Sequence, residues 1–439
     1  MNKSKLIMSL VAAGVLYGAP VVSDNLLGGV AKAANTAEQK AAPAKRVSKK
    51  VPAMRNRVYT QLARAQQLAD GGDKAAGFGV LDDVKARINQ LNSYEKAMMW
   101  NFYGFMHYGN DDIANAITSF ENVIAQEAIP ESLYLSTVYS LAQLAMQQQD
   151  YGKALGFLQQ WQMNNAKELQ SAQHILFAQV YYQDKKYADA LNHINAAIEL
   201  VKAKDETPKE NWLILQRAAY YELKQPEKVT QVMEELVRLY QKPQYWIQLA
   251  GMYGEIGKEK KQLGAMETAW QAGYISKSSD IIMLAQLYLF NQLPYKAAKL
   301  LDDSIAKGIV IADEKRIQLM AQAYVMAKED DKAIPALIKG AEIAENGKFD
   351  EQLAQAYLNT EKWQQSIDSA KTALKRGDLD NEGNMHLALG MASFNLGNYD
   401  DAIASFANAQ NFKDVAKTAK QWTKYVEKER DYQQRLAMN

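Results

Sequence analysis

The chain has 439 residues, of which 48% are hydrophobic, and its 51 Lys and Arg nearly balance its 50 Asp and Glu. The formal net charge of +1 provides no basic footprint for nucleic acid, so a nucleic-acid partner is not expected. Cysteine is absent, which excludes disulfides, thiolate metal sites and a cysteine nucleophile.

Residues 1–33 have the composition of a signal peptide. Lys3 and Lys5 precede a mostly apolar, uncharged run at residues 6–22, and Ala31-Lys32-Ala33 offers the small-x-small pattern of a cleavage site. The sequence therefore predicts export, and the lack of cysteine fits an oxidising periplasm. The alternative is an uncleaved inner-membrane anchor, because the apolar run is near the ~17-residue lower limit for a spanning helix.

Residues 34–52 are rich in Ala, Lys and Pro and contain no aromatic residue. Such a segment buries too little apolar area to offset the entropy cost of ordering, so it is predicted to be a flexible basic linker. Either its charge contacts anionic headgroups or an acidic partner, or it is a solvated tether.

Residues 53–94 are predicted to form a degenerate first repeat or cap. The first helix is expected from Arg55 to Ala69, with apolar residues at helical spacing, and it is broken by Asp70-Gly71-Gly72-Asp73. A second helix is expected at about Val80 to Leu91.

Residues 95–411 contain a repeating pattern built around one small residue, here called the anchor. An aromatic residue often follows the anchor after three positions, and a small residue follows after twelve. The spacing between anchors is roughly 33 to 39 residues, close to the ~34 of a tetratricopeptide repeat. The anchors are Gly104, Ala142, Ala178, Arg217 (a poor copy), Ala250, Ala285, Ala321, Ala354 and Gly390.

The pattern predicts an all-α fold: a tetratricopeptide-repeat superhelical solenoid of about nine to ten helical hairpins. The copy at residues 389–409 is the most regular, with a helix, a glycine turn and a second helix. Residues 412–439 are predicted to be a charged C-terminal capping helix. Solenoids of this kind usually bind other proteins.

No arrangement of residues for catalysis is recognisable. There is no G-x-S-x-G nucleophile elbow, and the adjacent acids Glu234-Glu235 and Asp302-Asp303 are interpreted as solvated faces. His174 and His193 are expected on the two helices of one repeat and could approach each other. No further ligand spacing completes a metal site. The chain is therefore predicted to be non-enzymatic, with no catalytic residue, cofactor or metal.

The position after the anchor is expected to face the concave surface of the solenoid, and it is often glutamine. Aromatic residues share this face, and the resulting neutral groove suits an extended segment or a helix with apolar anchors. Lys and Arg are missing there, which argues against a clamp for a carboxylate terminus. The alternative is that the aromatics bury each other and the glutamines face solvent. The predicted partner-binding residues are Phe105, Tyr108, Gln143, Gln179, Tyr182, Tyr221, Gln286, Gln322 and Gln355.

Three stretches of the N-terminal third carry a family resemblance. They run from Arg55-Asn56-Arg57-Val58-Tyr59 to Asp70, from Leu91-Asn92-Ser93-Tyr94 to Phe105, and from Ile117-Thr118-Ser119-Phe120 to Tyr134. They resemble the periplasmic tetratricopeptide protein that accompanies some TonB–ExbB–ExbD energy-transducing systems of Gram-negative bacteria. The irregular repeat at Arg217, with Pro226 at its turn, departs from the general repeat pattern.

The resemblance implies a non-enzymatic accessory of TonB-dependent uptake of iron complexes. Its implied partners are TonB, ExbB and ExbD of the inner-membrane complex, and it supplies no catalytic residues. Two alternatives stay open. One is a scaffold for envelope assembly or peptidoglycan enzymes, and the other is an enzyme or a small-ligand binding protein.

Overall fold

The computed structural model describes residues 46, 47 and 49–438. The predicted signal peptide at 1–33 lies outside the described residues, as do residues 34–45 and 48 of the predicted linker. Within the described part of the chain, no helix combines the length and apolar character needed to cross a membrane.

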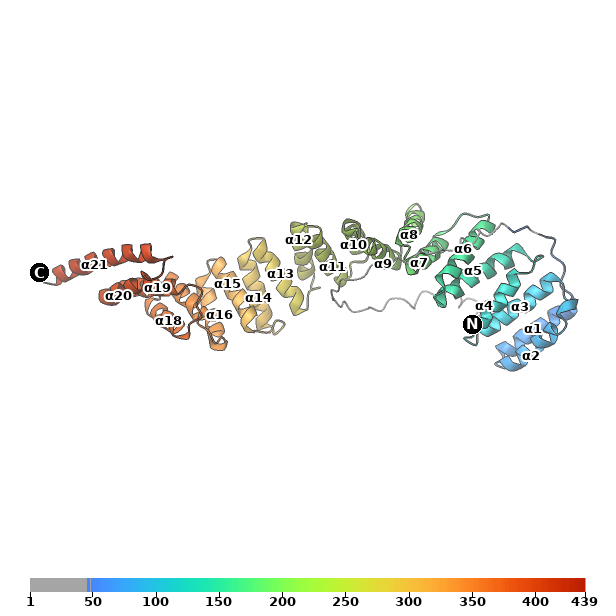
Figure 1. Cartoon of the computed structure of the whole chain (residues 1–439), viewed down its shortest axis with the longest axis horizontal. Helices are drawn as coiled ribbons and strands as arrows, with labels where there is room; N and C mark the ends of the chain where they lie inside the picture. Colours follow the sequence, from blue (N-terminus) through green and yellow to red (C-terminus); the bar gives the residue numbers. More distant parts are fainter. Residues whose placement is uncertain (1–45, 48, 439) are drawn as a thin grey trace, which may run out of the picture. The chain divides into compact units, whose positions relative to one another are not determined.

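The described residues form 21 α-helices and no strands, and successive helices pair into about ten hairpins (Figure 1). The predicted all-α tetratricopeptide-repeat fold is confirmed. The chain divides into two compact units, Met1–Val232 and Met233–Asn439, and the boundary lies within α10 (Pro226–Tyr240).

The other helices of the first unit are α1 (Asn56–Asp70), α2 (Lys74–Lys85), α3 (Ser93–Tyr108), α4 (Ile113–Ile124), α5 (Glu131–Gln147), α6 (Tyr151–Asn164), α7 (Ser171–Gln183), α8 (Tyr187–Lys202) and α9 (Glu210–Glu222). The helices of the second unit after α10 are α11 (Pro243–Glu255), α12 (Glu259–Gln271), α13 (Ser278–Phe290), α14 (Pro294–Ala306), α15 (Glu314–Met326), α16 (Asp330–Ile343), α17 (Lys348–Asn359), α18 (Trp363–Arg376), α19 (Glu382–Asn395), α20 (Tyr399–Ala409) and α21 (Ala416–Met438).

Each hairpin turns at a residue with a positive φ angle, which lies seven positions after the anchor in the nine repeats that have one. In the regular copy this residue is Gly397, whose φ of 79° costs glycine no steric strain. Most other copies place a residue with a Cβ in the same conformation, as at Lys185 with φ 60°. The turn geometry is therefore set by the packing of the two helices, and glycine only makes it easier. The other positions are Gly72, Asp111, Gln149, Lys224, Gly257, Gln292, Lys328 and Glu361.

The core of a hairpin is built where its first helix passes its second. The anchor meets the residue sixteen positions later, and the sizes of the two are complementary. Where the anchor is glycine the partner is phenylalanine: a Cβ added to Gly390 would lie 2.6 Å from Phe406. Where the anchor is alanine, the partner is usually smaller, as in the buried pair Ala142 and Leu158. Close packing of this kind fixes the distance between the two helices.

Tyrosine hydroxyls connect consecutive hairpins of the second unit. Tyr253 donates to Glu234 at 2.6 Å, and Tyr324 donates to Asp302 at 2.9 Å. The interpretation of these two acids as merely solvated is therefore wrong, because each accepts a bond from the next hairpin. The pKa of Tyr253 is raised, first by burial and then by its bond to Glu234.

The first hairpin begins its second helix earlier than expected. The sequence predicts a helix at about Val80 to Leu91, whereas α2 spans Lys74–Lys85. The Asp73 side chain accepts from the Ala76 N–H and caps the helix. Gly77 lies within this helix because a Cβ there would approach the Ala65 carbonyl oxygen to 2.9 Å. That glycine permits close packing on α1 and does not break the helix.

The described end of the predicted linker packs against the second and third hairpins. The Arg46 guanidinium lies 4.6 Å from the ring centroid of Tyr134 and donates to the Gln126 carbonyl at 3.1 Å. The backbone N–H of Arg46 donates to Asn164 Oδ1 at 2.8 Å. Lys49 pairs with Glu127 in the α4–α5 loop. These contacts hold Arg46 and Lys49 against the repeats.

Candidate protein-binding surface

Three of the predicted partner-binding residues meet in one shallow pocket of the first unit. Phe105 and Tyr108 from α3 and Gln143 from α5 line a cavity of about 30 Å³. Phe105 is 42% exposed, and its ring meets Phe120 edge to face at 5.3 Å between centroids. An exposed aromatic ring held in place by a buried one is suited to receive an apolar side chain of a partner.

Two more predicted residues meet in a larger pocket of the second unit. Gln322 of α15 and Gln355 of α17 line a cavity of about 340 Å³. The Gln355 amide donates to Asn359 Oδ1 at 2.8 Å, and Asn359 donates to Asp330 at 3.0 Å. Each amide has more donors and acceptors than these bonds use, and the remaining ones can pair with the backbone of an extended chain. The remaining lining residues are Gln318, Val325, Met326, Gln352, Ala356 and Asp380.

The other four predicted residues line neither pocket. Gln179 and Tyr182 of α7 are half-buried, and the Tyr182 ring packs edge to face on Tyr187 at 5.3 Å. Burial raises the pKa of Tyr182, with the nearby Glu222 adding to the effect. Tyr221 is 66% exposed, and Gln286 is also exposed. The structure therefore gathers five predicted residues into two pockets and leaves four outside them.

The larger pocket contains residues that the sequence analysis missed. Gln318 precedes Gln322 by one helical turn, and Met326 follows it by one turn on the same face of α15. Gln352 and Asn359 extend the amide surface on α17. The sequence contains a pattern that could have identified most of these residues, because they lie about four positions before or after a glutamine that follows an anchor.

His174 and His193, which the sequence places on the two helices of one repeat, lie close together. The Nδ1 atoms of His174 and His193 lie 3.0 Å apart, and the His193 ring stacks on Phe177 at 4.7 Å and 3°. One Nδ1 must donate the hydrogen bond and the other must accept it. The accepting nitrogen carries no proton, so at least one of the two rings is neutral. Burial, with His174 adding to it, lowers the pKa of His193 to about 4. Among residues 46–438, no group of three or more His, Asp or Glu could hold a metal ion.

We expect this pair to make the first unit sensitive to acid. The folded pKa of His193 lies below the ordinary value of 6.5, so its stabilising effect is full above pH 6.5 and is lost as the pH falls towards 4. After a discount for solvent at the half-buried ring, the loss is about 1 to 2 kcal/mol. Thermal melting of wild type and His174→Gln/His193→Gln across this range tests it. Equal acid-induced decreases in Tm would contradict the prediction.

Two family models match parts of the chain. The model for subunit 3 of the anaphase-promoting complex, cyclosome, matches residues 109–197, and a tetratricopeptide-repeat model matches residues 352–415. No curated protein matches the sequence. The fold and these matches together define a protein of tetratricopeptide-repeat architecture. Proteins of this architecture are typically non-enzymatic scaffolds for protein–protein interaction.

Several solved structures are similar to parts of the chain. MamA of MSR-1 is 23% identical, with 41% of this chain and 99% of that chain covered, at a TM-score of 0.33. YrrB, a tetratricopeptide-repeat protein with an unusual peptide-binding site, is 12% identical, with 44% and 97% covered and a TM-score of 0.36. The TPR2AB domain of yeast Sti1, in a complex with pHSP90, is 16% identical, with 58% and 98% covered and a TM-score of 0.26.

Proposed function

We propose that this chain is an exported, non-enzymatic scaffold that captures segments of partner proteins on the exposed face of its first helices. One observation supports this most directly: Gln322 and Gln355, which follow successive anchors, line the same pocket of about 340 Å³. The pocket offers amides, the half-exposed side chain of Met326 and the carboxylates of Asp330 and Asp380, without Lys or Arg. Such a surface favours a neutral extended segment over a carboxylate terminus.

The partner assignment depends on the sequence resemblance. The residues around Arg55–Asp70 and Leu91–Phe105 resemble the periplasmic repeat protein of TonB–ExbB–ExbD systems. We infer that the scaffold works in the periplasm and supports TonB-dependent uptake of iron complexes by binding TonB, ExbB or ExbD. The export signal that the sequence predicts at residues 1–33 and the absence of cysteine are consistent with that compartment.

The double variant Gln322→Ala/Gln355→Ala is expected to weaken capture of the TonB–ExbB–ExbD complex by about tenfold or more. Each amide that loses a hydrogen bond to the partner costs about 1 kcal/mol, and 1.4 kcal/mol corresponds to a factor of ten. Both glutamines are exposed, so the helical circular dichroism signal should not change. The measurement is co-purification of the three proteins from detergent-solubilised membranes with tagged protein.

The matched control is Gln364→Ala/Gln365→Ala, which removes two exposed amides from α18, the second helix of its hairpin. This variant should capture the complex as wild type does. If both double variants behave alike, the first-helix face is not the binding surface. A photocrosslinking residue at position 322 separates the partner classes, because crosslinks confined to peptidoglycan enzymes would replace the TonB assignment with an envelope-assembly scaffold.

A further inference from the structure

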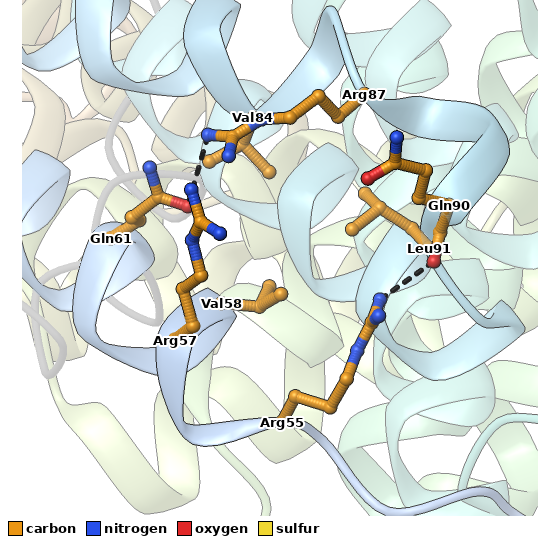
Figure 2. A pocket seen from close by; sticks show the side chains of 8 residues that line it. All are labelled: Arg55, Arg57, Val58, Gln61, Val84, Arg87, Gln90 and Leu91. Carbon is orange, nitrogen blue, oxygen red and sulfur yellow. Dashed lines mark hydrogen bonds between the residues drawn. The ribbon is translucent and has the colours of Figure 1, made fainter.

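A second kind of site lies in the first hairpin, separate from both candidate binding pockets. A cavity of about 90 Å³ opens between the start of α1, the end of α2 and the short 3-10 helix η2 (Ile88–Gln90) (Figure 2). Three of its lining residues are arginines: Arg55, Arg57 and Arg87. Figure 2 shows the side chains of Arg57 and Arg87 extending towards the same region beside Gln61.

The charges of these arginines are not equally compensated. Arg55 is paired with the buried Glu95, with Nη2 and Oε2 2.6 Å apart, so its charge is balanced inside the protein. Arg87 meets only neutral oxygens, at Gln61 Oε1 (3.4 Å) and the Asp83 carbonyl (3.2 Å). In the described part of the chain, neither Arg57 nor Arg87 forms an ion pair. Two positive charges therefore remain at the mouth of this cavity.

The rest of the cavity indicates what kind of anion fits. Val58 and Val84 are buried beneath the arginines, and Leu91 adds a further apolar contact. A glutamate side chain carries a planar carboxylate that an arginine fork binds in two parallel hydrogen bonds, on an apolar stem that can contact the valines. A free phosphate ion has no apolar part. The small volume admits one such side chain and not a folded element.

We propose that Arg57 and Arg87 form a receptor for a single acidic side chain of a partner protein. Binding supplies the negative charge that the cavity lacks and relieves the repulsion between the two guanidinium groups. The proposal rests on the proposed scaffold function, to which it adds a charged contact at the start of the array. Because the carboxylate is bound near the surface, its contribution should decrease with salt.

The test uses the purified protein and a labelled, acetylated and amidated tetraglutamate peptide at low ionic strength. Fluorescence anisotropy should detect binding of this peptide and not of the corresponding tetraglutamine peptide. Arg57→Gln should weaken binding by about tenfold, the loss expected for one charge-assisted pair. Since no hydrogen bond or ion pair joins the Arg57 side chain to another residue within the described part of the chain, the variant should keep the wild-type Tm. These measurements involve no TonB component, so they can fail independently of the proposed function.

Arg64→Gln is the matched control, because Arg64 is an exposed arginine of α1 outside the cavity. Its affinity for the peptide should equal that of wild type. Equal losses in Arg57→Gln and Arg64→Gln would show diffuse attraction and overturn the proposal, as would undiminished binding by Arg57→Gln. Displacement of the peptide by inorganic phosphate at lower concentrations than acetate requires would overturn the assignment to a carboxylate.

Discussion

Replacing Phe406 by Ala is expected to lower the free energy of unfolding of the last hairpin by about 3 to 5 kcal/mol. Its side chain has no exposed surface, and its ring stacks on Trp422 at 5.7 Å and 15°. The ring also fills the space beside Gly390, so truncation leaves a cavity that α19 cannot close without moving. Hydrogen exchange of the amides in α19 and α20 measures the loss locally.

The size complementarity between anchor and partner makes a sharper test. Gly390→Ala alone gains about 1 kcal/mol of helix propensity, but its Cβ would meet the Phe406 ring, an overpacking cost of about 1 to 3 kcal/mol. Phe406→Leu alone leaves a gap. Together the two changes reproduce the pair seen at Ala142 and Leu158. We expect the double variant to be at least about 1 kcal/mol more stable than the sum of the single effects.

Strict additivity in this cycle would contradict the explanation of the repeat core. Thr423→Ala on α21 is a suitable control, because its half-buried side chain lies outside the contact between Gly390 and Phe406. Combined with Gly390→Ala, it should give additive effects within about 0.5 kcal/mol, as expected for sites that share no partner.

The sequence predicts the fold well because each repeat is defined by the spacing of small and apolar residues that lie close together in the sequence. Anchors such as Ala321 recur with a period close to one hairpin, and the residues around them lie on one helical face. The same register placed Gln322 and Gln355 on a shared surface, and they line one pocket. The periodicity therefore predicts which residues of successive first helices lie on a shared surface, although it does not give the distances between the helices.

Contacts between residues of different helices or hairpins could not be predicted from the spacing within one repeat. The bond from Tyr253 to Glu234 joins residues of different repeats, and the acid alone has the composition of a solvated face. The expected start of α2 at about Val80 was too late, because the close packing of Gly77 on the Ala65 carbonyl depends on a contact between two helices. The arginine cavity joins Arg57 to Arg87 only after α1 and α2 have folded together.

One buried carboxylate ties the chain before α1 to the start of α3. Glu95 is fully buried and, together with Asn92, forms the capping box of α3. It also accepts from Arg55 three times, from the backbone N–H at 2.9 Å, from Nε at 2.8 Å and from Nη2 at 2.6 Å. The bonds from Arg55, assisted by the Asn92 N–H, lower the pKa of Glu95 to about 2 despite its burial.

Arg55→Met is therefore expected to destabilise the first hairpin by about 3 to 5 kcal/mol, because it leaves the Glu95 charge buried and uncompensated. Glu95→Gln should cost less, since the half-exposed Arg55 can be hydrated when its partner is neutral. Hydrogen exchange of α1 and α2 measures both, with Arg64→Met as a control expected to have little effect. If Glu95→Gln destabilises the first hairpin more than Arg55→Met does, the uncompensated charge of Glu95 does not explain the effect of losing this ion pair.

The same carboxylate predicts how the first hairpin responds to acid. Because the folded pKa of Glu95 is about 2 and its ordinary value is 4.5, the unfolded chain binds the proton first as the pH falls. Its stabilising effect, about 3 kcal/mol, is complete above pH 4.5 and is lost between pH 4.5 and 2. In Glu95→Gln, the protection of the α1 and α2 amides from hydrogen exchange should decrease less than in wild type as the pH falls from 4.5 to 2. Parallel curves for wild type and variant would mean that other groups control the acid unfolding of this hairpin.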